Sequence, residues 1–245
     1  MIIINILWIS LACLFSYLFG SIPFSVWLGK LVKDTDLRTQ KVKNPGGFNA
    51  LRTFGPKIGL PIMFLDFFKG TIPFAFIDQL FSLDYFVTPD GTNIWHGIAC
   101  ILGPMFCILG HNYPVWLKFK GGQGVGVFIG VLIYLNPLIF VLFLLLFIII
   151  MPLFKISAQH LTMIVGAVCL VAILFIPISP PWSLVNQGVL VKLNGIIQLQ
   201  PAFVLIGMEI MIYLRYFQKI IARSRAVGKW TFSIKEGEEH LEGKK

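Results

Sequence analysis

The stretch Gly-His-Asn-Tyr-Pro-Val-Trp-Leu-Lys-Phe-Lys-Gly-Gly-Gln-Gly-Val-Gly, residues 110–126, is a polar, glycine-rich interruption between two apolar blocks. Its glycines can adopt positive φ and bring backbone N–H groups close to a ligand, and an apolar run that predicts a helix begins at Val125. This arrangement suits an anion, because Lys118 and Lys120 add positive charge beside it. If the stretch stood alone, a tight loop between membrane helices would be the better explanation.

A second glycine-rich turn, Asn-Pro-Gly-Gly-Phe-Asn-Ala-Leu-Arg at residues 44–52, repeats this pattern. The groups that can donate to a phosphate are the N–H groups of Gly46 and Gly47, the amides of Asn44 and Asn49, and the guanidinium of Arg52. For either stretch the alternative is an ordinary turn beside a basic residue that only sets the membrane topology. Two such turns in one chain favour anion binding.

The composition is that of an integral membrane protein. Of the 245 residues 57% are hydrophobic and 13% charged, and the mean hydropathy is +0.83. The net charge of +9 therefore indicates membrane topology and not nucleic-acid binding. The four cysteines lie in apolar runs without metal or redox spacing, so we expect buried small side chains and no metal or cofactor.

Seven membrane-spanning helices are predicted from the apolar blocks. They are residues 3–29, 58–80 and 94–111, the two halves of 125–154, and residues 158–178 and 201–214. Gly20, Ser21 and Pro23 interrupt the first block. A hairpin at Asn136-Pro137 divides residues 125–154, because a single span there would export the basic C-terminal segment.

The distribution of Lys and Arg predicts an all-α membrane protein with its N-terminus outside and its C-terminus in the cytosol. Residues 1–230 are expected to form one membrane domain, and residues 231–245 a flexible cytosolic tail. Both glycine-rich turns then lie on the cytosolic face of the plasma membrane. The bilayer itself is an expected partner of the chain.

Asp66 and Lys69 lie three residues apart on one face of the predicted second span. Charges at that depth cost several kcal/mol unless they are paired or hydrated. The two residues therefore either neutralise each other or orient the polar loops, and pairing is the favoured interpretation.

At these motifs the chain resembles the PlsY-type acyl-phosphate:glycerol-3-phosphate acyltransferases, as a divergent member. The matched residues are Gly-Ser-Ile-Pro-Phe at 20–24, Gly29-Lys30, Asp36-Leu37-Arg38, Asn44, Pro45, Gly46, Asn49, Arg52 and Thr53 in the second turn, Asp66, Lys69 and Gly70, and residues 110–125. These matches occur in the family's order and cover the first half of the chain.

The resemblance implies a seven-helix enzyme that moves a fatty acyl group from acyl phosphate to the 1-hydroxyl of glycerol 3-phosphate, giving lysophosphatidic acid and phosphate. Both substrates carry phosphate, in agreement with two anion-suited turns. The residues implied as catalytic are Arg52 and His111, and those implied to bind substrate are Ser21, Arg38, Asn44, Gly46, Gly47, Asn49, Lys120, Gly121, Gly122, Gln123 and Gly124.

The chain departs from the family pattern at several positions. The family's serine is replaced by Val42, its threonine by Phe48, and the lysine of Gly-Gly-Lys-Gly by Gln123. The His and Asn of the family's third motif are missing from residues 215–229. The main alternative is therefore a non-catalytic relative that binds an anionic lipid or phosphorylated metabolite. A small-solute transporter is less favoured, because no clear inverted repeat is present.

Overall fold

The structure is a helical bundle, seen in a computed structural model that describes residues 2–41, 43–89, 93–154, 158–176, 180–185, 192–193 and 197–227. The α-helices in these ranges are α1 (Ile2–Ser21), α2 (Phe24–Lys33), α3 (Gly47–Phe54), α4 (Pro56–Phe81), α5 (Ile94–Asn112), α6 (Val125–Leu135), α7 (Pro137–Phe154), α8 (Ala158–Phe175) and α9 (Leu199–Val227). Two short strands, β1 (Lys192–Leu193) and β2 (Ile197–Gln198), pair antiparallel. The predicted tail at 231–245 lies outside the described residues.

Helices occupy all seven of the predicted positions. Within the described ranges, four helical stretches are long and apolar enough to cross a membrane: Ile2–Lys33, Pro56–Phe81, Ile94–Leu117 and Pro137–Phe154. Val125–Leu135 and His160–Phe175 are shorter apolar helices. The chain is therefore an integral membrane protein by its helices, while the number of seven spans and their orientation stay predictions.

Both predicted interruptions are confirmed. The first apolar block divides into α1 and α2 at Ile22 and Pro23. Residues 125–154 divide at Asn136, whose side-chain oxygen accepts hydrogen bonds from the N–H groups of Leu138 (3.1 Å) and Ile139 (3.2 Å). Asn136 therefore caps the start of α7, which is the favoured role of Asn at a helix N-terminus.

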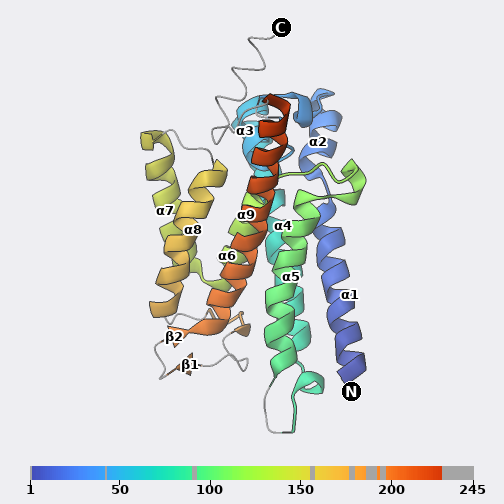
Figure 1. The fold of residues 1–245 in the computed structure, drawn as a ribbon, viewed down its shortest axis with the longest axis vertical. Helices are drawn as coiled ribbons and strands as arrows, with labels where there is room; N and C mark the ends of the chain where they lie inside the picture. Colours follow the sequence, from blue (N-terminus) through green and yellow to red (C-terminus); the bar gives the residue numbers. More distant parts are fainter. Residues whose placement is uncertain are drawn as a thin grey trace.

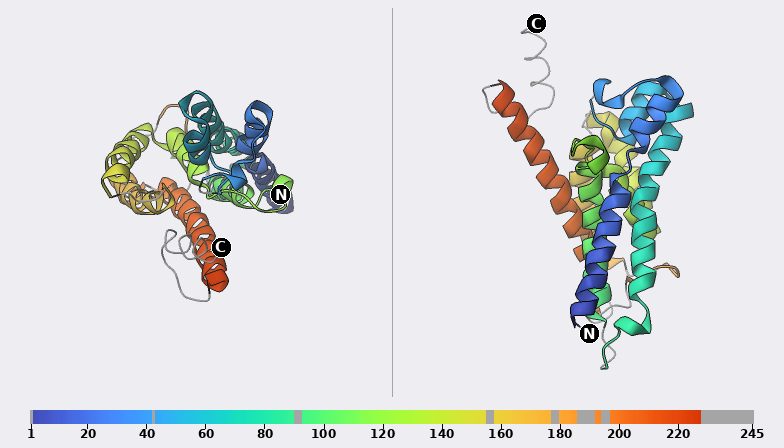
Figure 2. Two further views of the ribbon diagram at one scale, coloured as in Figure 1. Left: turned by 90° about the horizontal axis from the view of Figure 1, so that it is seen from above. Right: turned by 90° about the vertical axis from the view of Figure 1, so that its right-hand side faces the viewer.

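The last helix is longer than predicted, because it continues beyond residue 214 to Val227. The added turns are rich in Arg, Lys, Gln and Ala, which are good helix formers, and the end of an apolar run does not stop such a helix. Figure 2 shows α9 diverging from the other helices toward its C-terminal end.

The helices form two groups joined by α6 (Figure 1). In one group α1 and α4 pack against α5, and α3 lies against the first half of α4. In the other, α7 packs against α8, and α9 closes the bundle between α8 and α5. The end of the bundle that carries α2 and α3 is opposite to the end with the N-terminus and the β1–β2 pair (Figure 1).

Glycines bring α4 and α6 together. A Cβ on Gly126 would lie 2.8 Å from Cβ of Asp66, and one on Gly130 would overlap the carbonyl oxygen of Phe67. Glycines spaced four residues apart let the backbones of two helices approach this closely. As a result, the start of α6 is held directly against the polar part of α4.

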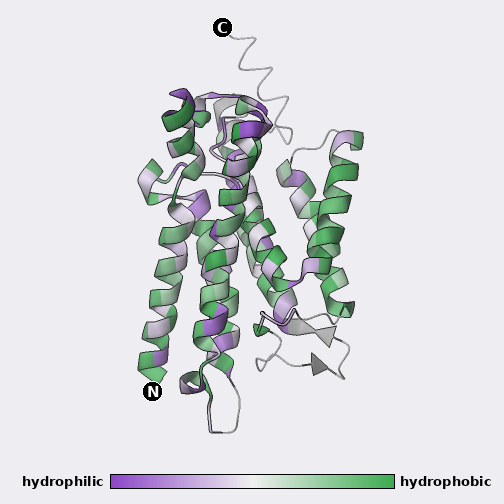
Figure 3. Cartoon of the chain, turned by 180° about the vertical axis from the view of Figure 1, so that it is seen from behind, coloured by the Kyte–Doolittle hydropathy of each residue, from purple (hydrophilic) through white to green (hydrophobic). Residues whose placement is uncertain are grey.

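Large apolar side chains also cover the outside of the bundle. Helix α7 has a mean hydropathy of 3.0, yet only 17% of its residues are buried inside the bundle. Hydrophobic residues run along the helices, whereas hydrophilic residues gather around the end with α2 and α3 (Figure 3). An apolar exterior of this kind is stable in lipid and not in water.

Candidate functional site

The two glycine-rich turns meet at one cavity on the α3 end of the bundle. The cavity has about 380 Å³ of empty space, including its open mouth. Its lining residues are Asn44, Gly46, Gly47, Phe48, Met63, Asp66, His111, Gln123, Val125, Gly126 and Ala158. Residues from both turns, more than sixty positions apart in the chain, thus contribute to one site.

The turn at residues 44–52 is held against α4 by Asp66. Oδ2 of Asp66 accepts a hydrogen bond of 2.8 Å from the N–H of Gly47, the first residue of α3. Oδ1 lies 3.0 Å from Nζ of Lys69, and both side chains are 2% exposed. The predicted pairing of Asp66 with Lys69 is confirmed. The carboxylate therefore joins a buried cation to a helix N-terminus, where negative charge is stabilised.

In the turn at residues 110–126, backbone N–H groups form hydrogen bonds within the protein. The N–H groups of Gly121 and Gly122 donate to the carbonyl oxygens of Asn112 (3.2 Å) and His111 (3.0 Å), which end α5. The guanidinium of Arg215, from α9, donates to the carbonyls of Gly121 and Gly122, at 3.2 Å each. These two N–H groups therefore do not face a ligand, contrary to the role expected from the sequence, because the free carbonyls of α5 take them.

Helix N-termini border the cavity. The N-caps of α3 and α6 are Gly46 and Gly124, which have no side chain to cap these helices, and at the start of α3 the N–H of Gly47 is already bound by Asp66. Gly124 has a φ of 83°, in the left-handed region that favours glycine. The first residues of both helices, Gly47 and Val125, line the cavity. Two helix N-termini therefore converge there. The Asp66 carboxylate occupies that of α3, so the start of α6 is the one left to suit a phosphate.

His111 stands between this cavity and a second, smaller one. The second has about 190 Å³ of empty space and is lined by residues that include Ser21, Lys69, His111, Gly121 and Gly122. The imidazole is 6% exposed. A Cβ on Gly122 would overlap Nε2 of His111, so glycine is needed there to admit the ring.

Four of the predicted site residues lie elsewhere. Arg52 and Lys120 are exposed and are not among the described residues that line either cavity. Arg38 forms an ion pair of 2.6 Å with Asp36, and its hydrogen bonds lower the pKa of the Asp36 carboxyl. The buried amide of Asn49 donates to the carbonyls of Leu37, Gln40 and Asn44 at 2.9–3.1 Å. Asn49 therefore holds the loop that precedes α3.

Comparison with known proteins places the chain in a family. A family model described as glycerol-3-phosphate acyltransferase matches residues 10–225. The chain belongs to the glycerol-3-phosphate acyltransferase family. The predicted resemblance is therefore confirmed.

Named relatives agree with this assignment. The chain is 38% identical over 136 residues to a glycerol-3-phosphate acyltransferase of Acholeplasma laidlawii, an alignment that covers 55% of this chain and 56% of that protein. It is 37% identical over 159 residues to the enzyme of that name from Staphylococcus haemolyticus, covering 64% of this chain and 74% of that protein. The chain thus spans little more than half the length of the Acholeplasma relative.

Two solved structures have the same fold. One is PlsY, an integral membrane glycerol 3-phosphate acyltransferase, in its glycerol 3-phosphate form, with a TM-score of 0.62 and 26% identity over 93% of this chain and 97% of that one. The other is the lysophosphatidic acid form of PlsY, with a TM-score of 0.61 and 24% identity over 91% and 94% of the two chains. The second likeness is one of fold alone.

Asp66 and Arg215 have roles that the sequence did not fully predict. Pairing of Asp66 with Lys69 was the favoured interpretation and orientation of the polar loops the alternative; Asp66 does both, because it also holds Gly47 and lines the cavity. Arg215 was not singled out, although it donates to the carbonyls of the Gly121–Gly122 turn and stacks on Tyr113 at 4.6 Å. A cationic residue facing a glycine turn across the bundle leaves no signal in local sequence.

Proposed function

We propose that this member of the family transfers a fatty acyl group from acyl phosphate to the 1-hydroxyl of glycerol 3-phosphate. The products are lysophosphatidic acid and inorganic phosphate. One observation carries the proposal: the cavity joins a polar wall, which includes the N-terminus of α6, to an apolar wall. Such a cavity matches substrates that combine a phosphate with an acyl chain.

The polar wall is assigned to phosphate. The start of α6 offers N–H groups, while Asn44 and Gln123 can donate from their amides. The apolar wall, made of Phe48, Met63, Val125 and Ala158, is assigned to the first carbons of the acyl chain. The PlsY structure in its glycerol 3-phosphate form supports the choice of acceptor.

We assign to His111 the role of general base, which takes the proton of the 1-hydroxyl. The oxygen of the 1-hydroxyl attacks the acyl carbonyl carbon, the bond from that carbon to the phosphate oxygen breaks, and phosphate leaves with the electron pair. The hydroxyl proton passes to the imidazole, since neutral histidine has one acceptor nitrogen. The positive end of α6 stabilises charge on the phosphate as it leaves.

The function is tested with the purified full chain in lipid nanodiscs. With palmitoyl phosphate and glycerol 3-phosphate, we expect phosphate and lysophosphatidic acid to form in equal amounts. Palmitoyl coenzyme A in place of palmitoyl phosphate tests the donor. Binding of glycerol 3-phosphate without any product from either donor would support the alternative, a non-catalytic lipid- or metabolite-binding relative.

We further propose seven spans in the plasma membrane, with the N-terminus outside and the cavity facing the cytosol. On a chain whose four cysteines are replaced by serine or alanine, Asp84→Cys should react with a membrane-impermeant maleimide in intact cells. Lys120→Cys should react only after the cells are opened. Both positions are exposed in the structure, and labelling of both in intact cells would contradict this orientation.

Gln123→Lys should raise turnover or tighten substrate binding by about tenfold, because a charge-assisted contact is worth roughly 1.5–3 kcal/mol. Gln123 lies in the cavity wall, and the family pattern has lysine at this position. The measurement is kcat/KM for glycerol 3-phosphate and for palmitoyl phosphate. Gln40→Lys adds the same charge outside the cavity and should leave both values unchanged. Equal kinetics for the two variants would remove Gln123 from the phosphate site.

A further inference from the structure

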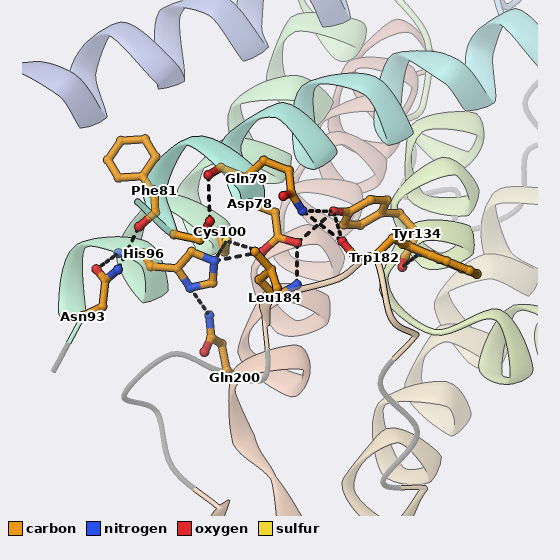
Figure 4. Close-up of polar contacts among 11 residues, drawn as sticks. Asp78, Gln79, Phe81, Asn93, His96, Cys100, Tyr134, Trp182, Leu184 and Gln200 are labelled. Carbon is orange, nitrogen blue, oxygen red and sulfur yellow. Dashed lines mark hydrogen bonds and ion pairs between the residues drawn. The ribbon is translucent and has the colours of Figure 1, made fainter. Parts of the chain in front are cut away.

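A second polar cluster lies inside the bundle at the end opposite to the substrate cavity. Asp78 of α4 faces His96 and Cys100, which lie four residues apart on one face of α5 (Figure 4). Asp78 and Asp66 are twelve residues apart on α4, which corresponds to about 18 Å along the helix axis. The proposed acyl transfer uses none of these three residues.

The three side chains present an oxygen, a nitrogen and a sulfur to one point. Their ligand atoms all lie within 4.8 Å of one another, and in the part of the chain that the structure describes no other group of three His, Cys, Asp or Glu side chains does so. The exposed fractions are 0% for Asp78, 2% for His96 and 0% for Cys100. Histidine, thiolate and carboxylate are the ligands that Zn²⁺ takes in proteins.

One of the three separations matches a tetrahedral ion, and the other two lie within about half an ångström of it. Ligand atoms bound to Zn²⁺ at ~2.0–2.3 Å are about 3.3–3.6 Å apart at the tetrahedral angle. Sγ of Cys100 lies 3.5 Å from Nε2 of His96 and 3.9 Å from Oδ1 of Asp78. Nε2 of His96 lies 2.8 Å from Oδ1 of Asp78, a hydrogen-bond distance. A shift of about half an ångström in one side chain would therefore replace the shared proton by a metal ion.

The surrounding residues hold the ligands in place. The second oxygen of Asp78 accepts hydrogen bonds of 2.8 Å from the hydroxyl of Tyr134 and from the N–H of Leu184 (Figure 4). The backbone N–H of His96 donates to Oδ1 of Asn93 (3.0 Å), a helix cap that fixes the backbone of His96 and not its ring. Metal-binding carboxylates are usually held by outer hydrogen bonds like those of Asp78.

Gln200 of α9 provides a separate indication. Its amide nitrogen lies 3.5 Å from Nδ1 of His96, while its amide oxygen is buried without a hydrogen-bond partner. The side chain is 1% exposed. When Nε2 of His96 binds a metal, Nδ1 carries the proton and needs an acceptor. Turning the amide by half a rotation gives the orphaned oxygen that role.

We propose that Asp78, His96 and Cys100 bind one Zn²⁺, with Gln200 as the hydrogen-bond acceptor of His96. Three protein ligands leave the fourth tetrahedral position to a water molecule. The ion would connect α4 to α5 and, through the outer partners of the ligands, to α6, α9 and the segment 180–185. Its effect is on the stability of this end of the bundle, independent of the acyl transfer proposed for the other end.

A buried hydrogen-bond cluster without metal is the competing explanation. Asp78 accepts from His96, Tyr134 and Leu184 in that case, and the cluster needs neither the thiol of Cys100 nor an acceptor at Nδ1 of His96. The two explanations therefore differ in the roles of Cys100 and Gln200. Local spacing could not show the site, because its carboxylate comes from a different helix than its other two ligands.

The test uses the full chain, purified in detergent without a histidine tag from cells supplied with zinc. Elemental analysis should find about one zinc per chain. Cobalt added after removal of zinc should give the thiolate-to-metal charge-transfer absorption of a cysteine ligand. Chelation should lower the thermal midpoint, and zinc should restore it. Absence of both stoichiometric zinc and the cobalt band in the unmutated chain overturns the proposal, whatever the variants do.

Two variants distinguish the role of Cys100 as a zinc ligand from that of Gln200 as a hydrogen-bond partner of His96. Cys100→Ser should weaken zinc binding by more than the roughly 10–100-fold expected for Gln200→Leu, which removes an outer partner. Cys169→Ser changes another buried free cysteine, in α8, and should keep the zinc. Zinc content and affinity that are unchanged in Cys100→Ser would identify a hydrogen-bond cluster and reject the metal site.

Discussion

Replacing Lys69 with methionine is expected to lower the free energy of unfolding by about 3–5 kcal/mol, the usual cost of breaking a buried ion pair by removing one partner. Lys69 and Asp66 are both 2% exposed, so the carboxylate would be left buried without its cation. The N–H of Gly47 would remain as its hydrogen-bond donor. Chemical unfolding of the purified protein in detergent, followed by tryptophan fluorescence, measures the change.

Two controls isolate the charge effect. Lys57→Met removes an exposed lysine from the same helix and should change stability by less than about 0.5 kcal/mol. The double change Asp66→Asn with Lys69→Met removes the uncompensated charge and keeps an acceptor for Gly47, so it should recover part of the loss. A Lys69→Met protein as stable as the Lys57→Met protein would mean that the pair contributes nothing to folding.

The apolar blocks predicted the helices well because membrane helices depend on local hydrophobicity. Chain breaks at Pro23 and Asn136 follow from residues that end or cap helices wherever they occur. The last helix shows the limit of this reasoning. Its basic C-terminal half leaves the apolar block but keeps helix-forming residues, so hydropathy alone ended it near residue 214 and not at Val227.

Arg52 belongs to a sequence motif but does not line the cavity in the described part of the chain. The turn at residues 44–46 leads into α3, which begins at Gly47. Five residues later a helix has risen about 7.5 Å and turned by roughly 140° beyond a full circle. The Arg52 side chain therefore lies on a different face of α3 from Gly47, is exposed, and is not among the described residues that line the cavity. Residues at the start of α3, in contrast, remain in the cavity wall.

The sequence does not show which acceptors bind the N–H groups of Gly121 and Gly122. Their N–H groups were expected to face an anion, but the carbonyls at the end of α5 lie within 3.2 Å and take them. Helix ends always carry such unsatisfied carbonyls, and the nearest donors bind them first. What these glycines provide is space, since Gly122 admits the ring of His111.

His111→Asn is expected to reduce kcat by roughly 10²–10⁴-fold, the usual contribution of a general base. The variant keeps a polar side chain of smaller size but loses an acceptor nitrogen that can take a full proton. His160→Asn makes the same change at a histidine that is not among the described cavity residues, and it should keep normal turnover. Phosphate release from palmitoyl phosphate, measured at saturating glycerol 3-phosphate, compares the two.

Chemical rescue separates proton transfer from simple positioning. In His111→Gly, a space opens between the two cavities that the imidazole now divides, and added imidazole should restore part of the lost turnover. Rescue should rise with the concentration of free imidazole base, whereas KM for glycerol 3-phosphate should change little. If His111→Asn keeps turnover within a factor of about three, well below the effect of a general base, the leaving phosphate takes the hydroxyl proton and His111 serves only to shape the cavity.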